Sequence, residues 1–211
     1  MPSSRSPFHD NGIDNITEPP YVRKIRIVLH EKDIPCDFIV EGPWDPGSSV
    51  PKHNPLGKVP VLVLENDLPL YDSRVIVQFL ELTSKQRPLL SSEPKARIDA
   101  LRWEALADGM LDAIVLRYLE GRREPQFRDP AWIERQAGKQ TAGLRAASEM
   151  LGERSFCVGE QFGLADIALA VALGYIDLRA PEPWRDRHNN LARLFDRMQE
   201  RPSFTSTAPP T

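Results

Sequence analysis

The chain has 211 residues, of which 41% are hydrophobic and 27% charged, so it holds enough apolar material for one or two domains with a sizeable core. A formal net charge of −3 leaves no basic surplus, which argues against nucleic acid or an anionic membrane as a partner. No run of about 18 apolar residues is present, so no membrane span is expected.

The two cysteines, Cys36 and Cys157, stand far apart and form no C-x-x-C or Cys/His metal pattern. So few thiols are typical of a reducing compartment. Residues 1–17 are polar and lack the apolar stretch of a secretory signal. These features predict a cytoplasmic protein without a metal site.

The first half of the chain mixes helix and strand signals. Residues 1–15 are rich in Pro, Ser, Asn and Asp and are expected to form an irregular or disordered tail. Apolar residues at helical spacing then predict a helix over 21–32. Short apolar runs predict a strand at 36–40 and, beyond a loop, a hairpin with strands at 59–64 and 68–71.

The second half shows only helical patterns. A polar, proline-containing stretch at 85–94 is the expected linker between a first domain at 16–84 and a helical domain at 95–205. Helical spacing recurs in four segments of the second domain: 96–120, 131–151, 164–178 and 191–199. The chain is therefore predicted to be an α/β unit followed by a separate helical domain.

The most informative segment is 54–62 (NPLGKVPVL), because Pro60 removes a hydrogen-bond donor where an apolar strand begins. A cis bond between Val59 and Pro60 would explain this choice, since cis costs little only before proline. The turn would direct the backbone N–H and C=O of Val59 outward, where they could pair with a peptide-like ligand.

Asp72 and Ser73 stand where a strand is expected to become a helix. Free N–H groups at a helix N-terminus attract a carboxylate, and a serine hydroxyl adds another donor. Lys58 offers a point charge to a second carboxylate. The set suits a small extended ligand with an acid group at each end. The alternative is that Asp72 and Ser73 only cap a helix and that Lys58 is a solvated surface side chain.

Four motifs carry a resemblance to a known family: PYVRKIR at 20–26, NPLGKVPVL at 54–62, YDSR at 71–74 and GLADIAL at 163–169. In order and spacing they resemble the glutathione S-transferases, the small bacterial type in particular. The resemblance implies a thioredoxin-like N-terminal domain followed by an all-α helical-bundle C-terminal domain. It further implies glutathione as co-substrate, a small electrophile as second substrate, and a homodimer.

By position, the resemblance implies that Val59 bonds the cysteinyl backbone of glutathione and that Asp72 and Ser73 hold its γ-glutamyl end. Lys58 would assist the glycyl carboxylate, and His53 would line the same edge.

In the helical domain, the resemblance implies that Asp108 reaches across a dimer to the γ-glutamyl ammonium, whereas an ordinary solvated charge on the helix face is the favoured alternative. Gly163 and Asp166 form a capping signal for the 164–178 helix, with a structural role.

The start of the chain departs from the family pattern. Members of the bacterial type carry a Ser or Cys directly before the PYVRK run, and this group stabilises the glutathione thiolate. Pro19 stands there and donates no hydrogen bond. Thr17 is the nearest hydroxyl and the candidate catalytic residue, although its spacing differs by two. Residues 10–17 also make a poor strand. Either the N-terminus is divergent or residues 1–19 are not the family's native start.

Three functions therefore stay open. The first is a glutathione S-transferase that acts on small electrophiles. The second, favoured by Pro19, is a glutathione- or ligand-binding protein with little transferase activity. The third is a partner-binding module on the same fold.

Overall fold

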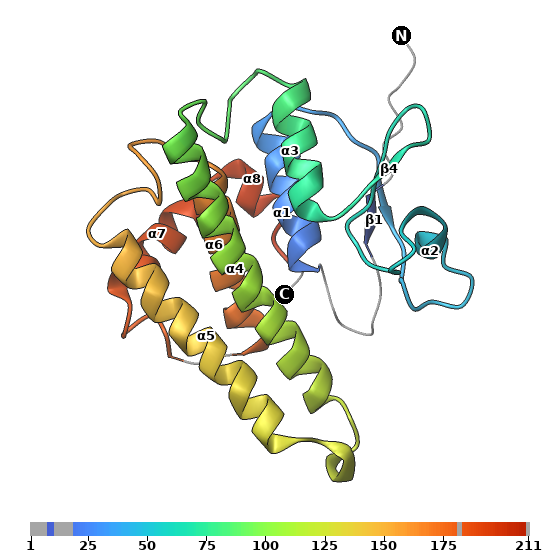
Figure 1. The fold of residues 1–211 in the computed structure, drawn as a ribbon, viewed down its shortest axis with the longest axis vertical. Coiled ribbons are helices and arrows are strands. Elements are labelled where there is room, and N and C mark those ends of the chain that lie inside the picture. The colour runs from blue at the N-terminus through green and yellow to red at the C-terminus, as the bar shows by residue number, and fades with distance from the viewer. Residues whose placement is uncertain (1–7, 11–18, 181–182, 210–211) are drawn as a thin grey trace. The chain divides into compact units, whose positions relative to one another are not determined.

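The computed structural model describes residues 8–10, 19–180 and 183–209 (Figure 1). The chain divides into two compact units. One comprises the residues up to Leu89 together with the segment from Pro202 onward, and the other is Leu90–Arg201. The change of unit after Leu89 falls inside the 85–94 segment. No helix of the described residues is both long and apolar enough to cross a membrane.

The first unit contains a four-stranded sheet with the order β2-β1-β3-β4. β1 runs parallel to β2 and antiparallel to β3, which forms an antiparallel hairpin with β4. The strands are β1 (Phe8–Asp10), β2 (Phe38–Val40), β3 (Leu62–Val63) and β4 (Pro69–Leu70). The prediction of an irregular tail through residue 15 is wrong at Phe8–Asp10. A central strand pairs its backbone on both sides, and this pairing outweighs weak strand propensity.

Four helices accompany the sheet: α1 (Pro20–Glu31), α2 (Val50–His53), α3 (Ser73–Thr83) and α8 (Pro202–Thr205). α1 and α3 lie side by side (Figure 1). Residues 202–205 fall within the predicted helical domain at 95–205, but α8 packs on α1 of the first unit. The backbone oxygen of Phe204 accepts a 3.3 Å hydrogen bond from Arg23, and Ser203 bonds Glu31 at 2.5 Å. These contacts, distant in sequence, had no local signal.

A buried ion pair ties the end of α1 to the end of α3. Lys32 Nζ lies 2.7 Å from Glu81 Oε1, and the two side chains are 0% and 5% exposed. Lys32 also donates to the backbone oxygen of Gln86, and Glu81 accepts from the backbone N–H of Leu89 at 3.2 Å. Buried charges persist only when they are paired and hydrogen-bonded. The pair therefore fixes both helix ends and the chain that leaves the unit.

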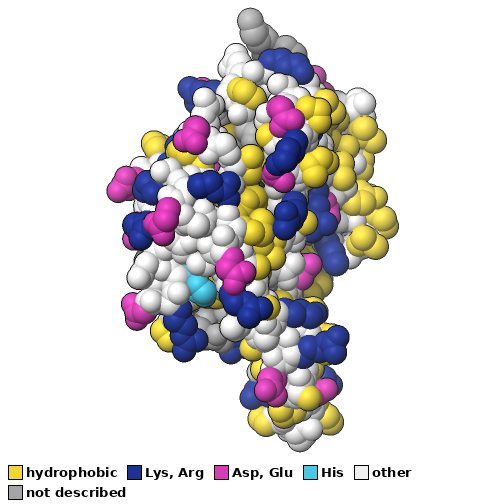
Figure 2. Space-filling view, turned by 60° about the vertical axis from the view of Figure 1, so that its left-hand side comes forward, with side chains coloured by type: hydrophobic (Ala, Val, Ile, Leu, Met, Phe, Trp, Pro, Cys, Tyr) yellow, Lys and Arg dark blue, Asp and Glu magenta, His cyan; other side chains and the backbone are white. Residues whose placement is uncertain are grey.

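The second unit is helical, as predicted. Its main helices are α4 (Pro94–Gly121), α5 (Pro130–Leu151), α6 (Leu164–Arg179) and α7 (Asn189–Gln199), with a short 3-10 turn at Pro125–Phe127. α4 and α5 cross closely at Gly143, where an added Cβ would lie 2.5 Å from Cγ of Met110. Most of α6 is buried, in line with its expected role as the core helix. On the face shown in Figure 2, acidic and basic side chains are interspersed.

The capping signal before α6 has the predicted structural role. Asp166 accepts hydrogen bonds from the backbone N–H of Gly163 at 2.9 Å and of Cys157 at 2.8 Å. Burial raises the pKa of Asp166 and also that of the Cys157 thiol. One carboxylate thus joins the start of the core helix to the loop that precedes it.

Replacement of this carboxylate should destabilise the fold. We expect Asp166→Ala to lower the free energy of unfolding by about 2–4 kcal/mol, because two buried N–H groups lose their acceptor. Urea unfolding measures the change. Asp186→Ala, at an exposed position, is the control and should stay within about 0.5 kcal/mol of the parent. Equal stabilities of the two variants would contradict this role.

Candidate functional site

The β3–β4 hairpin brings two predicted binding segments to one end of the sheet. Leu62 pairs with Leu70 in antiparallel register. Pro60 precedes Leu62 by two residues, and Asp72 follows Leu70 by two residues. Since the strands are antiparallel, both segments leave the hairpin at its open end. The proline turn and the start of α3 are therefore neighbours, as the proposed cradle for an extended ligand requires.

The proline turn has the predicted peptide geometry. The bond between Val59 and Pro60 is cis, and the bond between Tyr71 and Asp72 is cis as well. Val59 is half-buried, whereas the adjacent Lys58 is exposed. Because the Lys58 side chain is exposed and Val59 is only half-buried, a ligand could contact both without any rearrangement of the core.

Asn54 holds this turn in place. Its side chain is 3% exposed, donates to the backbone oxygen of Lys58 at 2.8 Å and accepts from the backbone N–H of Leu56 at 3.0 Å. Its own backbone oxygen accepts from Gly57 at 2.8 Å. Asn54 lies within the 54–62 motif, where no role was predicted for it. The tendency of Asn to bond the backbone two residues ahead is the signal that could have found it.

At the start of α3, the predicted helix cap is present, and the residues predicted to bind the ligand lie at the same place. Oδ1 of Asp72 accepts from the backbone N–H of Arg74 at 2.9 Å, so the capping role is present. Asp72 remains exposed, and a carboxylate offers further acceptor positions. Ser73 is the first residue of α3 and is 2% exposed. The first N–H groups of a helix lack partners within the helix, so they can receive an acidic group.

The other residues predicted from the sequence lie outside the proline turn and the start of α3. His53 is the last residue of α2 and half-buried, next to Asn54. Asp108 lies in α4 of the second unit and is 1% exposed, so its interpretation as a solvated charge is wrong. Thr17 falls outside the described residues. Pro19 occupies the N-cap position of α1 and makes no side-chain hydrogen bond there.

The Asn54 bonds give a test of the turn. We expect Asn54→Ala to lower the free energy of unfolding by about 1–3 kcal/mol and to speed hydrogen exchange at the amide of Leu56, because two buried bonds are lost. Asn66→Ala is a matched control, since Asn66 makes a similar bond to Leu68 at an exposed turn. It should change stability by less than about 0.5 kcal/mol. Unaltered exchange at Leu56 would remove Asn54 from this role.

Two family models match the chain. The glutathione S-transferase N-terminal domain matches residues 20–83, which include the proline turn and the start of α3. The glutathione S-transferase C-terminal domain matches residues 130–197.

Individual relatives extend the similarity over nearly the whole chain. The uncharacterized GST-like protein YibF of Escherichia coli is 34% identical over 192 residues, which cover 90% of this chain and 95% of YibF. A Methylobacterium radiotolerans glutathione S-transferase, in complex with glutathione sulfonate, is 42% identical with a TM-score of 0.92, covering 98% of this chain and 96% of its own. A Methylobacillus flagellatus glutathione S-transferase with bound glutathione is also 42% identical with a TM-score of 0.92, and the coverage is 97% and 100%.

Proposed function

Because the chain belongs to the glutathione S-transferase family, we propose that it binds glutathione at the open end of the β3–β4 hairpin and transfers the thiolate to small electrophiles. The observation that carries the proposal is the hairpin register, which makes the proline turn and the start of α3 neighbours. Crystal structures of two relatives with bound glutathione or glutathione sulfonate support the choice of ligand.

Each part of the tripeptide has a matching group. The backbone of Val59 pairs with the cysteinyl residue as an added strand would. Ser73 and the first N–H groups of α3 receive the γ-glutamyl carboxylate, while Asp72 accepts from the adjacent ammonium. Lys58 provides a charge for the glycyl carboxylate, and His53 borders this edge. The contact of Asp108 with the γ-glutamyl ammonium of a second subunit, which the resemblance implies, is not part of this proposal because Asp108 is 1% exposed in the single chain.

Transfer requires a thiolate, and a free thiol has a pKa of about 8.5. A hydroxyl donor beside the sulfur would lower this pKa, and Thr17 is the proposed donor. Pro19, which carries neither an N–H nor a hydroxyl, favours a second candidate function: a glutathione-binding protein with little turnover. A partner-binding module that does not use glutathione is the outcome if no binding is found.

The proposal includes a homodimer in the cytoplasm. Exposed apolar side chains on α4, Ile98 at 63% and Leu116 at 40%, suit burial against a second copy. A reducing compartment keeps glutathione in the thiol form that the reaction consumes. Light scattering at micromolar concentration should give twice the mass of one chain, and a monomer would contradict the dimer.

Glutathione binding depends, in this proposal, on the hydroxyl of Ser73. We expect Ser73→Ala to weaken binding by about 1–3 kcal/mol, or roughly 5- to 150-fold in Kd, because the γ-glutamyl carboxylate loses a donor. Isothermal titration calorimetry with reduced glutathione measures the effect. Ser84→Ala, at the opposite end of α3, should leave Kd unchanged. Equal affinity of Ser73→Ala and the parent would reduce Ser73 to a helix-starting residue.

The thiolate donor has a separate test. With 1-chloro-2,4-dinitrobenzene as electrophile, we expect Pro19→Ser to raise kcat/KM by about tenfold or more, since it supplies a hydroxyl at the family position. Thr17→Val should raise the pKa of the bound thiol. A parent protein that binds glutathione but shows no turnover would establish the second candidate function, and an unshifted thiol titration would remove Thr17.

A further inference from the structure

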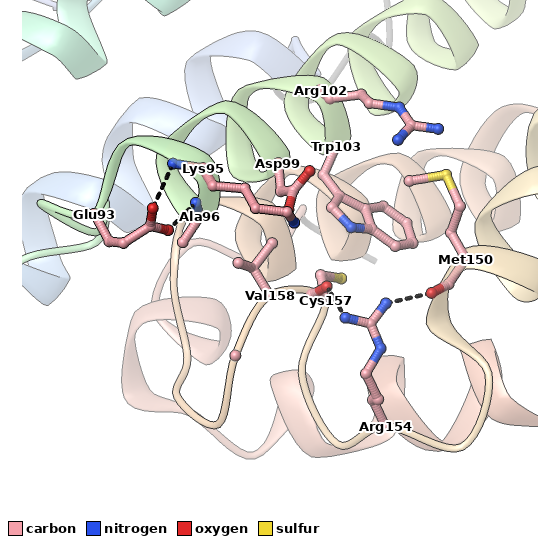
Figure 3. Close-up of a pocket in the computed structure, with 11 residues that line it drawn as sticks. Glu93, Lys95, Ala96, Asp99, Arg102, Trp103, Met150, Arg154, Cys157 and Val158 are labelled. Atoms are coloured by element: carbon pink, nitrogen blue, oxygen red, sulfur yellow. Dashed lines mark hydrogen bonds and ion pairs between the residues drawn. The ribbon is translucent and has the colours of Figure 1, made fainter.

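A pocket of about 440 Å³ lies wholly within the second unit and has no part in the proposed glutathione site (Figure 3). It is enclosed by the first turns of α4 and by the chain that joins α5 to α6. Its volume falls in the range of small-molecule sites. The charges, donors and apolar surfaces that line it identify the kind of ligand it suits.

Both carboxylates of the pocket are already engaged. Glu93 caps α4 and accepts from the backbone N–H groups of Lys95 at 2.8 Å and Ala96 at 2.5 Å. Asp99 pairs with Nζ of Lys95 at 2.9 Å. Each carboxylate of the pocket therefore has a partner, and the charge of Asp99 is offset by Lys95.

The guanidinium of Arg154 is held by neutral acceptors. It donates to the backbone oxygens of Leu151 at 3.2 Å, of Cys157 at 2.8 Å and of Met150. These bonds hold the group at the wall of the pocket, and Figure 3 shows those to Cys157 and Met150. Because none of the acceptors is a carboxylate, the positive charge of Arg154 is fixed but not neutralised.

Arg102 is a second cation of the pocket that no carboxylate binds directly. It is exposed and makes no hydrogen bond or ion pair with any residue that the structure describes. The pKa of Asp99 is lowered, mainly by the hydrogen bond from Lys95 and further by the charges of Arg102 and Arg154. The charge of Arg102 is therefore felt inside the pocket. With three cationic and two anionic side chains, the pocket has a surplus of positive charge.

The apolar part of the lining completes the site. Trp103 is 2% exposed, and its indole N–H donates to no group of the described residues. In Figure 3 the indole lies between the guanidinium groups of Arg102 and Arg154, with the Met150 side chain beside it. An unpartnered indole donor and the Met150 side chain next to the surplus positive charge favour an organic anion over an inorganic one.

We propose that this pocket binds a small organic carboxylate, which pairs with the guanidinium of Arg102 and rests its apolar part on Met150, beside the edge of Trp103. Arginine recognises a carboxylate through two parallel N–H bonds, which a solvated exposed side chain can supply without cost to the fold. This site is independent of glutathione and goes beyond the proposed function.

The test uses benzoate as the carboxylate and neutral benzamide as its matched control. The indole N–H signals of the four tryptophans are followed by nuclear magnetic resonance with glutathione present at saturation, and Trp103→Phe identifies the Trp103 signal. We expect benzoate to shift this signal with a Kd on the order of 1 mM. Benzamide and inorganic phosphate should bind at least about tenfold more weakly than benzoate.

Two variants separate recognition from general charge. Arg102→Gln should weaken benzoate binding by about tenfold or more, because the charge-assisted pair is lost. Arg145→Gln removes an equally exposed arginine of α5 outside the pocket and should leave Kd unchanged. Ser73→Ala should also bind benzoate as the parent does, even if it loses glutathione. Equal binding of benzoate and benzamide, an unaltered Kd in Arg102→Gln, or phosphate as strong as benzoate would each overturn the proposal.

Discussion

The β3–β4 pairing is the constraint on which the candidate site depends. It is only two residue pairs long, yet its antiparallel register decides that the proline turn and the first turn of α3 stand together. A shift of this pairing by one residue would turn the side chains of one strand to the opposite face and displace the two segments relative to each other. The buried pair between Lys32 and Glu81 secures the far end of α3, so the helix is fixed at both ends.

Elements that depend on local pattern were predictable from the sequence. The four helical segments of the second unit follow from apolar spacing, and the hairpin follows from two apolar runs around Asn66 and Asp67. The cis bond before Pro60 also had a local signal, because a proline stood at the entry of a buried strand. The cap at Asp166 was visible for the same reason.

Features that rest on distant contacts were not predictable. β1 at Phe8–Asp10 forms between two strands that lie far from it in sequence. The burial of Asp108 is likewise set by the packing of its surroundings and not by its neighbours along α4. The role of Asn54 became visible only from the position of the Lys58 backbone oxygen, to which its side chain donates. The pocket beside Trp103 is formed by segments about fifty residues apart, and no sequence motif predicts it.

The placement of α8 has a consequence for how the chain is made. Phe204 is fully buried against an element that begins at Pro20, so the first unit is not continuous in sequence. The segment from Pro202 onward must leave the ribosome before this unit closes, and by then the helices of the second unit have already emerged. The first unit is therefore completed after the second, and a fragment that stops at Leu89 would leave the face of α1 that α8 covers exposed. Expression of that region alone needs the C-terminal segment fused back to it.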